Sequence, residues 1–137
     1  MLKINGYFIW VLLAFMLAVN PMPVHAVEKE IQWQSYDSGM DKAKAANQPV
    51  FLYFYADWCG FCTKMGKETF QDEAVIDYLN ANFTAVKVNS DKEQAIAKKY
   101  RIRGLPTTFL IDPDGKQTGP WPGYITKEKL MALIKRN

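Results

Sequence analysis

The sequence predicts an α/β fold, in which a central mixed β-sheet carries helices on both faces. Strand-like and helix-like patterns alternate along most of the chain, an order typical of a partly parallel sheet covered by helices. The segment 50–56 is apolar or aromatic at every position, as in a strand buried on both sides. Near the C-terminal end, the turn sequence at 112–115 predicts a closing hairpin, which adds an antiparallel edge.

The first half of the chain shows clear periodicity and clear end signals. After a polar lead-in, residues 31–33 alternate like a short edge strand. Residues 39–47 have apolar positions at helical spacing and end at an Asn-Gln-Pro sequence, which predicts a helix. The central strand over 50–56 follows, and a second helical pattern begins around residues 59–62.

Further helices and strands alternate in the second half. The predicted elements are a helix with its first apolar position at Ala74, a strand over 83–89, a helix over 91–100, a strand over 107–111, a short strand over 116–118 and a last helix with Thr126 as N-cap. No repeat and no low-complexity segment interrupts this order.

The composition fits one globular domain of ordinary size. The chain has 137 residues, of which 49% are hydrophobic and 23% charged, a balance that argues against a disordered protein. The net charge is only +3, and the basic residues are scattered apart from a short stretch at 98–103. We interpret that stretch as a solvated helix end and expect no nucleic-acid binding. We expect the domain to be a monomer.

The N-terminus has the layout of a secretory signal peptide. Lys3 gives a positive start, residues 6–19 carry no charge, and residues 24–26 place small side chains at the two positions that a signal peptidase reads. We expect residues 1–26 to be removed and residues 27–137 to form a domain in the periplasm or another extracytoplasmic compartment. An uncleaved membrane anchor is the alternative, although the apolar run is shorter than the about 20 residues of a membrane span.

Two cysteines, Cys59 and Cys62, lie where a helix begins after the central strand. A structural disulfide between them would close a loop too short to add much stability. A structural zinc site needs four ligands, and residues 27–137 contain only these two cysteines and no histidine. A Cys-x-x-Cys sequence at such a junction favours redox chemistry. We expect no cofactor and no metal.

The position of the pair predicts a mechanism. Free amide N–H groups and the helix dipole stabilise an anion at a helix start, so we expect Cys59 to be an exposed, nucleophilic thiolate. Cys62 follows three residues later and is expected to be shielded. Cys59 would attack a substrate disulfide, and Cys62 would then release the substrate from the mixed disulfide. The same pair can also run in the oxidising direction.

Two separated motifs resemble the thioredoxin superfamily, namely Tyr-Ala-Asp-Trp-Cys-Gly-Phe-Cys at 55–62 and Gly-Leu-Pro-Thr at 104–107. Together with Glu-Thr-Phe at 68–70 and with Asp72, Val75 and Leu79, they are similar to the periplasmic C-terminal domain of transmembrane thiol:disulfide interchange proteins. The resemblance implies a thioredoxin fold over 27–137 and a cis peptide bond before the proline of the second motif. It also implies that six residues bind substrate or support the site: Trp58, Gly60, Phe61, Leu105, Pro106 and Gly123.

The chain departs from this family pattern behind the second cysteine. Thioredoxins have a buried aspartate where Tyr53 stands, and the interchange domain has a helix acid where Gly66 stands. A phenol with a pKa near 10 is a poor base at neutral pH. Water, or Glu68 from a nearby turn, would then have to accept the proton of Cys62. The residues that remain as candidates for proton transfer or for tuning of the cysteine pair are Tyr53, Glu68 and Lys87.

Phe61 bears on the direction of electron flow. Strong oxidases and isomerases of the superfamily have a histidine at this position, which stabilises the thiolate, and Phe61 cannot do so. We therefore expect a reductase of disulfides in exported proteins, supplied with electrons by a membrane thiol transporter. The alternatives are a disulfide oxidase or isomerase with the same residues, or a non-catalytic binding or assembly module.

Overall fold

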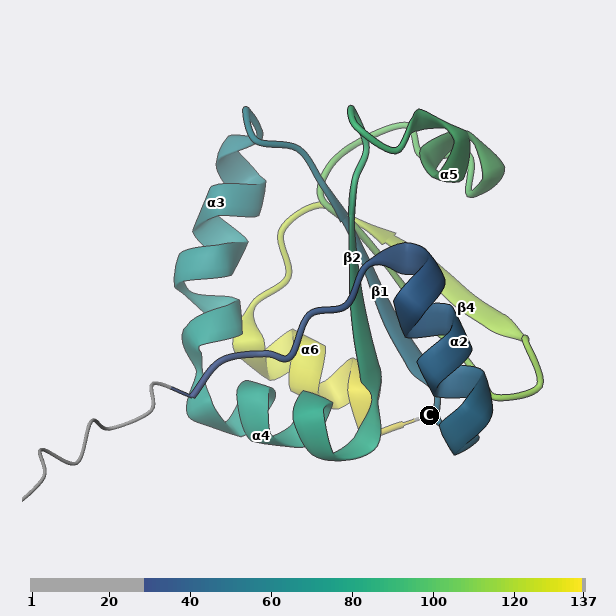
Figure 1. Cartoon of the computed structure of the whole chain (residues 1–137). Coiled ribbons are helices and arrows are strands. Elements are labelled where there is room, and N and C mark those ends of the chain that lie inside the picture. Colours follow the sequence, from purple (N-terminus) through teal and green to yellow (C-terminus); the bar gives the residue numbers. More distant parts are fainter. Residues whose placement is uncertain (1–28, 137) are drawn as a thin grey trace, which may run out of the picture.

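The computed structural model describes residues 29–136, so the predicted signal peptide at 1–26 lies outside the described residues. Within this part of the chain, a four-stranded sheet lies between two layers of helices (Figure 1). The elements in chain order are α2 (Tyr36–Ala46), β1 (Val50–Tyr55), α3 (Gly60–Lys67), η1 (Thr69–Gln71), α4 (Glu73–Asn82), β2 (Thr84–Asn89), α5 (Gln94–Lys99), β3 (Thr107–Ile111), β4 (Gln117–Pro122) and α6 (Lys127–Ile134).

The predicted mixed sheet is confirmed. The strand order is β2-β1-β3-β4, where β1 and β2 run parallel and the other two pairs run antiparallel. The central strand β1 is buried on both faces, as its unbroken apolar run predicts. Phe51 and Tyr53 pack with apolar residues of α3, α4 and α6, whereas Leu52 and Phe54 pack with those of α2 and α5. The sheet therefore separates two hydrophobic cores.

Polar side chains fix the beginnings of two helices. The Asp72 carboxylate accepts the backbone N–H groups of Ala74 and Val75 at the start of α4. Thr126 is the N-cap of α6, as predicted, and its hydroxyl oxygen accepts the N–H of Lys129. Each cap satisfies amide groups that have no partner within the helix.

The predicted edge strand over 31–33 is wrong. The structure has only a single parallel bridge here, between Gln34 and Val86. The backbone N–H of Trp33 donates to the carbonyl of Ile31, and this tight turn takes the segment out of a strand ladder. Ile31 is nevertheless buried, so the alternation of apolar residues came from core packing.

Three element boundaries also differ from the prediction. Helix α2 begins at Tyr36, before the predicted start at residue 39. Helix α5 begins only at Gln94, because the Asn89 side chain accepts the N–H groups of residues 91 and 92 and holds them in a turn. Strand β4 continues to Pro122, with a cis bond before Pro120. Prolines are tolerated there because β4 is the edge strand and needs partners on one side only.

Gly39 allows α2 to pack closely against β2. A Cβ atom at this position would overlap Cγ2 of Val86 and lie 3.0 Å from Cβ of Gln34. We expect Gly39→Ala to lower the free energy of unfolding by about 1–3 kcal/mol, because overpacking outweighs the gain in helix propensity. Gly66→Ala in α3 is the matched control, since no atom lies within 4 Å of the new Cβ. It should raise this free energy by up to about 1 kcal/mol. Urea unfolding measures both, and equal effects would contradict the packing role of Gly39.

Candidate active site

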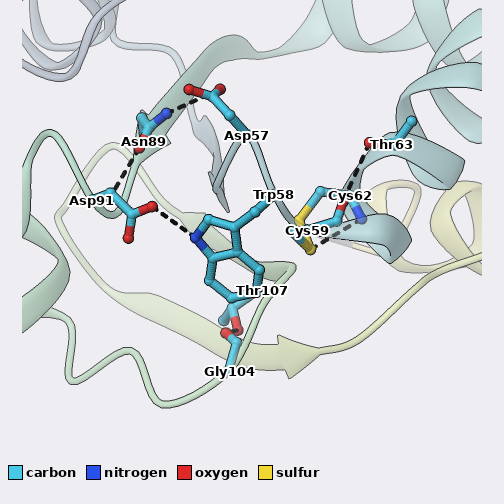
Figure 2. The surroundings of a disulfide bond; sticks show 9 residues. All are labelled: Asp57, Trp58, Cys59, Cys62, Thr63, Asn89, Asp91, Gly104 and Thr107. Carbon is cyan, nitrogen blue, oxygen red and sulfur yellow. Dashed lines mark hydrogen bonds between the residues drawn. A yellow bond between two sulfur atoms is a disulfide. The ribbon is translucent and has the colours of Figure 1, made fainter.

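The two cysteines lie at the junction of β1 and α3 and are joined in a disulfide, with Cα atoms 5.2 Å apart (Figure 2). Cys59 is the N-cap of α3, and its Sγ accepts a hydrogen bond of 3.2 Å from the backbone N–H of Cys62. The Thr63 hydroxyl donates to the Cys59 carbonyl at 3.3 Å. The sulfur of Cys59 therefore lies at the positive end of the helix dipole, as the sequence predicts. Gly60 follows on the surface, and no atom lies within 4 Å of the position that a Cβ would take there.

The predicted exposure of Cys59 is wrong for this disulfide form. Cys59 is 4% exposed and Cys62 6%, so the first cysteine has no advantage in access. Both side chains pack with Ala56, and the side chain of Leu105 covers the cluster. What distinguishes Cys59 is the hydrogen bond that its sulfur accepts at the start of the helix.

Two exposed aromatic side chains flank the disulfide. Trp58 is 73% exposed and Phe61 62%, and they are the exposed large hydrophobic residues within 29–136. The indole Nε1 of Trp58 donates a 2.8 Å hydrogen bond to the carboxylate of Asp91 (Figure 2). Asp91 itself follows Asn89, whose side chain accepts the Asp91 N–H and donates to Asp57. This chain of hydrogen bonds holds the indole in place while its ring stays in solvent.

The loop before β3 completes the surface around the disulfide. The Leu105–Pro106 peptide bond is cis, which confirms the expectation from the resemblance. Pro106 is buried, and its carbonyl accepts a 2.7 Å hydrogen bond from the N–H of Gly123. Gly123 has a φ of 88°, in the left-handed region that favours glycine. The structure thus brings the cysteine loop, the 104–107 loop and the loop after β4 together.

A cavity of about 300 Å³ lies beside Cys62, and Tyr53 and Lys87 both line it. Tyr53 is 5% exposed, and its hydroxyl has no protein hydrogen-bond partner within residues 29–136. Burial raises the pKa of Tyr53 above that of a free phenol, and the nearby Tyr55 adds to this effect. The phenol is therefore neutral at physiological pH and is a poor proton acceptor. Lys87 Nζ lies 5.9 Å from the centre of the Tyr55 ring.

Glu68 does not lie in this cavity. It caps the far end of α3, and its carboxylate accepts a 2.6 Å hydrogen bond from the Tyr124 hydroxyl, which raises the pKa of Tyr124. It lines a second cavity in which neither cysteine takes part.

The carboxylate among the residues that line the cavity with Cys62 is instead that of Asp57, which sequence reasoning missed as a site residue. Its side chain is largely exposed, forms an ion pair with Lys92 and accepts a hydrogen bond from Asn89. The position of Asp57 directly after the predicted central strand was the feature of the sequence that could have identified it.

Residues 29–136 contain neither a metal-binding cluster nor a helix suited to span a membrane. No group of three or more histidine, cysteine, aspartate or glutamate side chains in this part of the chain is placed to hold a metal ion. None of its helices combines the length and the apolar character that a membrane span requires.

Comparison with known proteins gives a consistent family assignment. Residues 36–137 match the Thioredoxin-like domain family. The chain is 34% identical over 99 residues to a thioredoxin of Mycoplasmoides gallisepticum, a match that covers 70% of this chain and 91% of that protein. It is 32% identical over 123 residues to the thiol:disulfide interchange protein DsbD of Pectobacterium atrosepticum, which covers 75% of this chain. That match spans only 21% of the interchange protein.

A solved structure agrees with these matches. The C-terminal domain of Neisseria meningitidis DsbD in the reduced form superposes with a TM-score of 0.61 at 29% identity. The superposition covers 74% of this chain and 92% of that domain. The likeness thus extends over almost the whole of the compared domain.

Proposed function

The chain belongs to the thioredoxin-like family of thiol–disulfide oxidoreductases, and we propose that it works outside the cytoplasm as a reductase of protein disulfides. The observation that carries this proposal is the Cys59–Cys62 disulfide at the start of α3, with the sulfur of Cys59 held by a backbone amide. Two exposed aromatic side chains, Trp58 and Phe61, flank the pair, and a protein substrate can pack against them.

The proposed reaction starts from the reduced protein. The thiolate of Cys59 attacks one sulfur of the substrate disulfide, so that a mixed disulfide forms and the other substrate sulfur leaves as a thiolate. Cys62 then loses its proton and attacks Sγ of Cys59. The Cys59–Cys62 disulfide forms, and the second substrate sulfur leaves and takes up a proton. The substrate gains two electrons and the protein loses two.

The proton of Cys62 needs an acceptor other than the buried aspartate of thioredoxins. We assign this role to water in the cavity beside Cys62, because Asp57, the carboxylate among the lining residues, is already bonded to Lys92 and Asn89. Tyr53 stays neutral because burial raises its pKa, and Glu68 lies at the other end of α3. The positive charge of Lys87 lies on the same cavity and favours the thiolate of Cys62.

The surface around the disulfide is proposed to bind an extended segment of the substrate. Trp58, Phe61 and Leu105 supply apolar contacts beside the cysteine pair. By the resemblance to the thioredoxin superfamily, we propose that the backbone beside Pro106 pairs with the substrate chain. Gly60 and Gly123 have open space where a side chain would stand, so the substrate backbone can approach closely.

The reducing direction and the electron donor rest on two further observations. Phe61 is uncharged and cannot stabilise the thiolate of Cys59 as a histidine would, which lowers the potential of the pair. After each turnover, the disulfide must be reduced by another dithiol. Because the chain is similar to part of a thiol:disulfide interchange protein, we propose a dithiol of a membrane thiol transporter as the donor.

Alkylation of the reduced protein tests the role of each cysteine. Because the helix start stabilises only the sulfur of Cys59, brief treatment with iodoacetamide at neutral pH should label Cys59 about tenfold faster than Cys62. Peptide mapping by mass spectrometry after quenching gives both rates. The unfolded protein is the control, in which the two rates should converge. Equal labelling rates of the two cysteines in the folded protein would contradict the assignment of Cys59 as the nucleophile.

Export is tested separately at the N-terminus. The sequence predicts that a signal peptidase cuts after Ala26, so the protein recovered from a cell-envelope fraction should begin at Val27. Edman sequencing of that protein identifies its N-terminal residue. A membrane-bound protein that still begins at Met1 would instead establish the uncleaved anchor.

A further inference from the structure

We propose that a groove between Trp58 and α5 binds an acidic segment beside the substrate's disulfide, and that Lys98 and Arg103 determine this specificity. The inference rests on the proposed function, since it names the class of protein disulfide that the site prefers. The groove has a volume of about 400 Å³. Its lining combines an apolar part, which includes Trp58, Ile102 and Leu105, with the two basic side chains.

The groove adjoins the reactive disulfide through two of its lining residues. Trp58 directly precedes Cys59 in the chain, and Leu105 packs against the cluster formed by Ala56 and the two cysteines. Both residues also line the groove. A substrate segment whose sulfur bonds to Cys59 therefore has to pass Trp58 and Leu105, and the groove lies directly beside that path.

The Trp58 side of the groove is ordered before any substrate arrives. Its indole is 73% exposed, yet the hydrogen bond from Nε1 to Asp91 fixes its position (Figure 2). An apolar surface that is already held in place costs little conformational entropy on binding. Trp58 and Leu105 thus bind an apolar residue of the substrate. The charges of Lys98 and Arg103 then favour acidic residues next to that apolar residue.

The lining of the groove carries two positive charges, those of Lys98 and Arg103. No aspartate or glutamate is among its lining residues. Within residues 29–136, Lys98 and Arg103 take part in none of the ion pairs, which join Lys29 to Asp77, Lys92 to Asp57 and Lys127 to Asp72. Of the two carboxylates near the cysteines and the indole, Asp57 forms an ion pair with Lys92. Asp91 accepts a hydrogen bond from the uncharged indole of Trp58, so it is one negative charge near the two positive ones.

These features favour an acidic partner through the rate of association. Both basic side chains are exposed, so each ion pair with a substrate would be weak and screened by salt. Complementary charge around a site nevertheless raises the association rate by about tenfold or more at low ionic strength. We therefore expect the preference in the rate of the first thiol attack, at Cys59.

Three synthetic disulfide peptides test the proposal. They share an apolar residue next to the cysteine and carry glutamate, glutamine or lysine at the flanking positions. Stopped-flow measurement of Trp fluorescence follows the reaction of the reduced protein with each peptide. At low salt we expect the acidic peptide to react about tenfold faster than the basic one, and we expect this ratio to shrink as salt is added.

Charge reversal assigns the effect to the groove. The double variant Lys98→Glu/Arg103→Glu should invert the preference, so that the basic peptide reacts faster than the acidic one. The control Lys42→Glu/Lys129→Glu makes the same change in net charge on exposed residues of α2 and α6, which do not line the groove. It should keep the preference for the acidic peptide.

The outcomes separate this inference from the proposed function. Equal rates with the three peptides, or the same loss of preference in both double variants, would overturn the groove's specificity and leave the reductase intact. No reaction of the wild-type protein with any of the peptides would overturn the reductase itself, and the inference with it.

Discussion

Replacing Cys62 with serine is expected to stop the reaction at the mixed disulfide. Serine is nearly the same size as cysteine but cannot attack Sγ of Cys59, so the substrate stays covalently attached. Turnover should fall by at least about a thousandfold, because release then depends on slow attack by an external thiol. In cells, the variant should appear in heavier bands on non-reducing gels, and these bands should disappear with reductant.

Cys59→Ser is the matched control for this experiment. Cys62 lies inside α3 and is buried, so without Cys59 it should trap little. Mass spectrometry of the trapped bands identifies the partners. A membrane thiol transporter together with a few exported cysteine proteins is the result expected for a reductase. Many unrelated secreted proteins would favour a general oxidase or isomerase, and stable partners without any trapping would favour a binding module.

The central elements of the fold could be predicted because the local sequence there is compatible with only one structural role. The run over 50–56 has no polar face, so it fits a strand between two layers and little else. Thr126 stands before an amphipathic segment, and its hydroxyl does cap α6. The Cys-x-x-Cys sequence and the Leu-Pro-Thr sequence lie far apart in the chain, yet both identify the same end of the sheet.

The rest depended on long-range packing that the sequence does not encode locally. Ile31 and Trp33 pack against the core from an irregular segment. A strand would place them there equally well, so the alternation of apolar residues does not distinguish the two structures. The segment after Thr118 contains glycine and proline, which normally interrupt strands, but its position at the edge of the sheet permits them. Only the strand order reveals that edge.

The same limit applies to the active site. Glu68 is close to Cys62 in sequence, but six residues of helix at ~1.5 Å each place it near the other end of α3. Asp57 and Lys87 come from different elements, and the pairing of β1 with β2 brings both to the cavity beside Cys62. The exposure of Cys59 was predicted from the helix start alone, whereas the side chain of Leu105, which packs against the cysteine cluster, comes from another loop.

The reduction potential of the Cys59–Cys62 pair decides the direction of the reaction. Phe61 is uncharged and 62% exposed, so it offers the thiolate of Cys59 no counter-charge. A reduced form without that stabilisation is a better electron donor. Equilibration with a glutathione or dithiothreitol buffer, followed by quantification of the two redox forms, should therefore give a potential below about −200 mV. A value near about −120 mV, where strong oxidants lie, would contradict the reductase.

Phe61→His then tests the cause of the low potential. An imidazolium next to the pair attracts the thiolate of Cys59, which stabilises the reduced form and raises the potential. A tenfold change in the equilibrium constant corresponds to about 30 mV, so we expect a rise of at least about 30 mV at pH 6, where the histidine is largely charged. The rise should diminish at pH 8, as the histidine loses its proton. Phe61→Gln is the control, since it adds polarity without charge and should stay within about 10 mV of the wild type. The same rise in both variants, without dependence on pH, would show that the loss of the aromatic ring, rather than the charge, sets the potential.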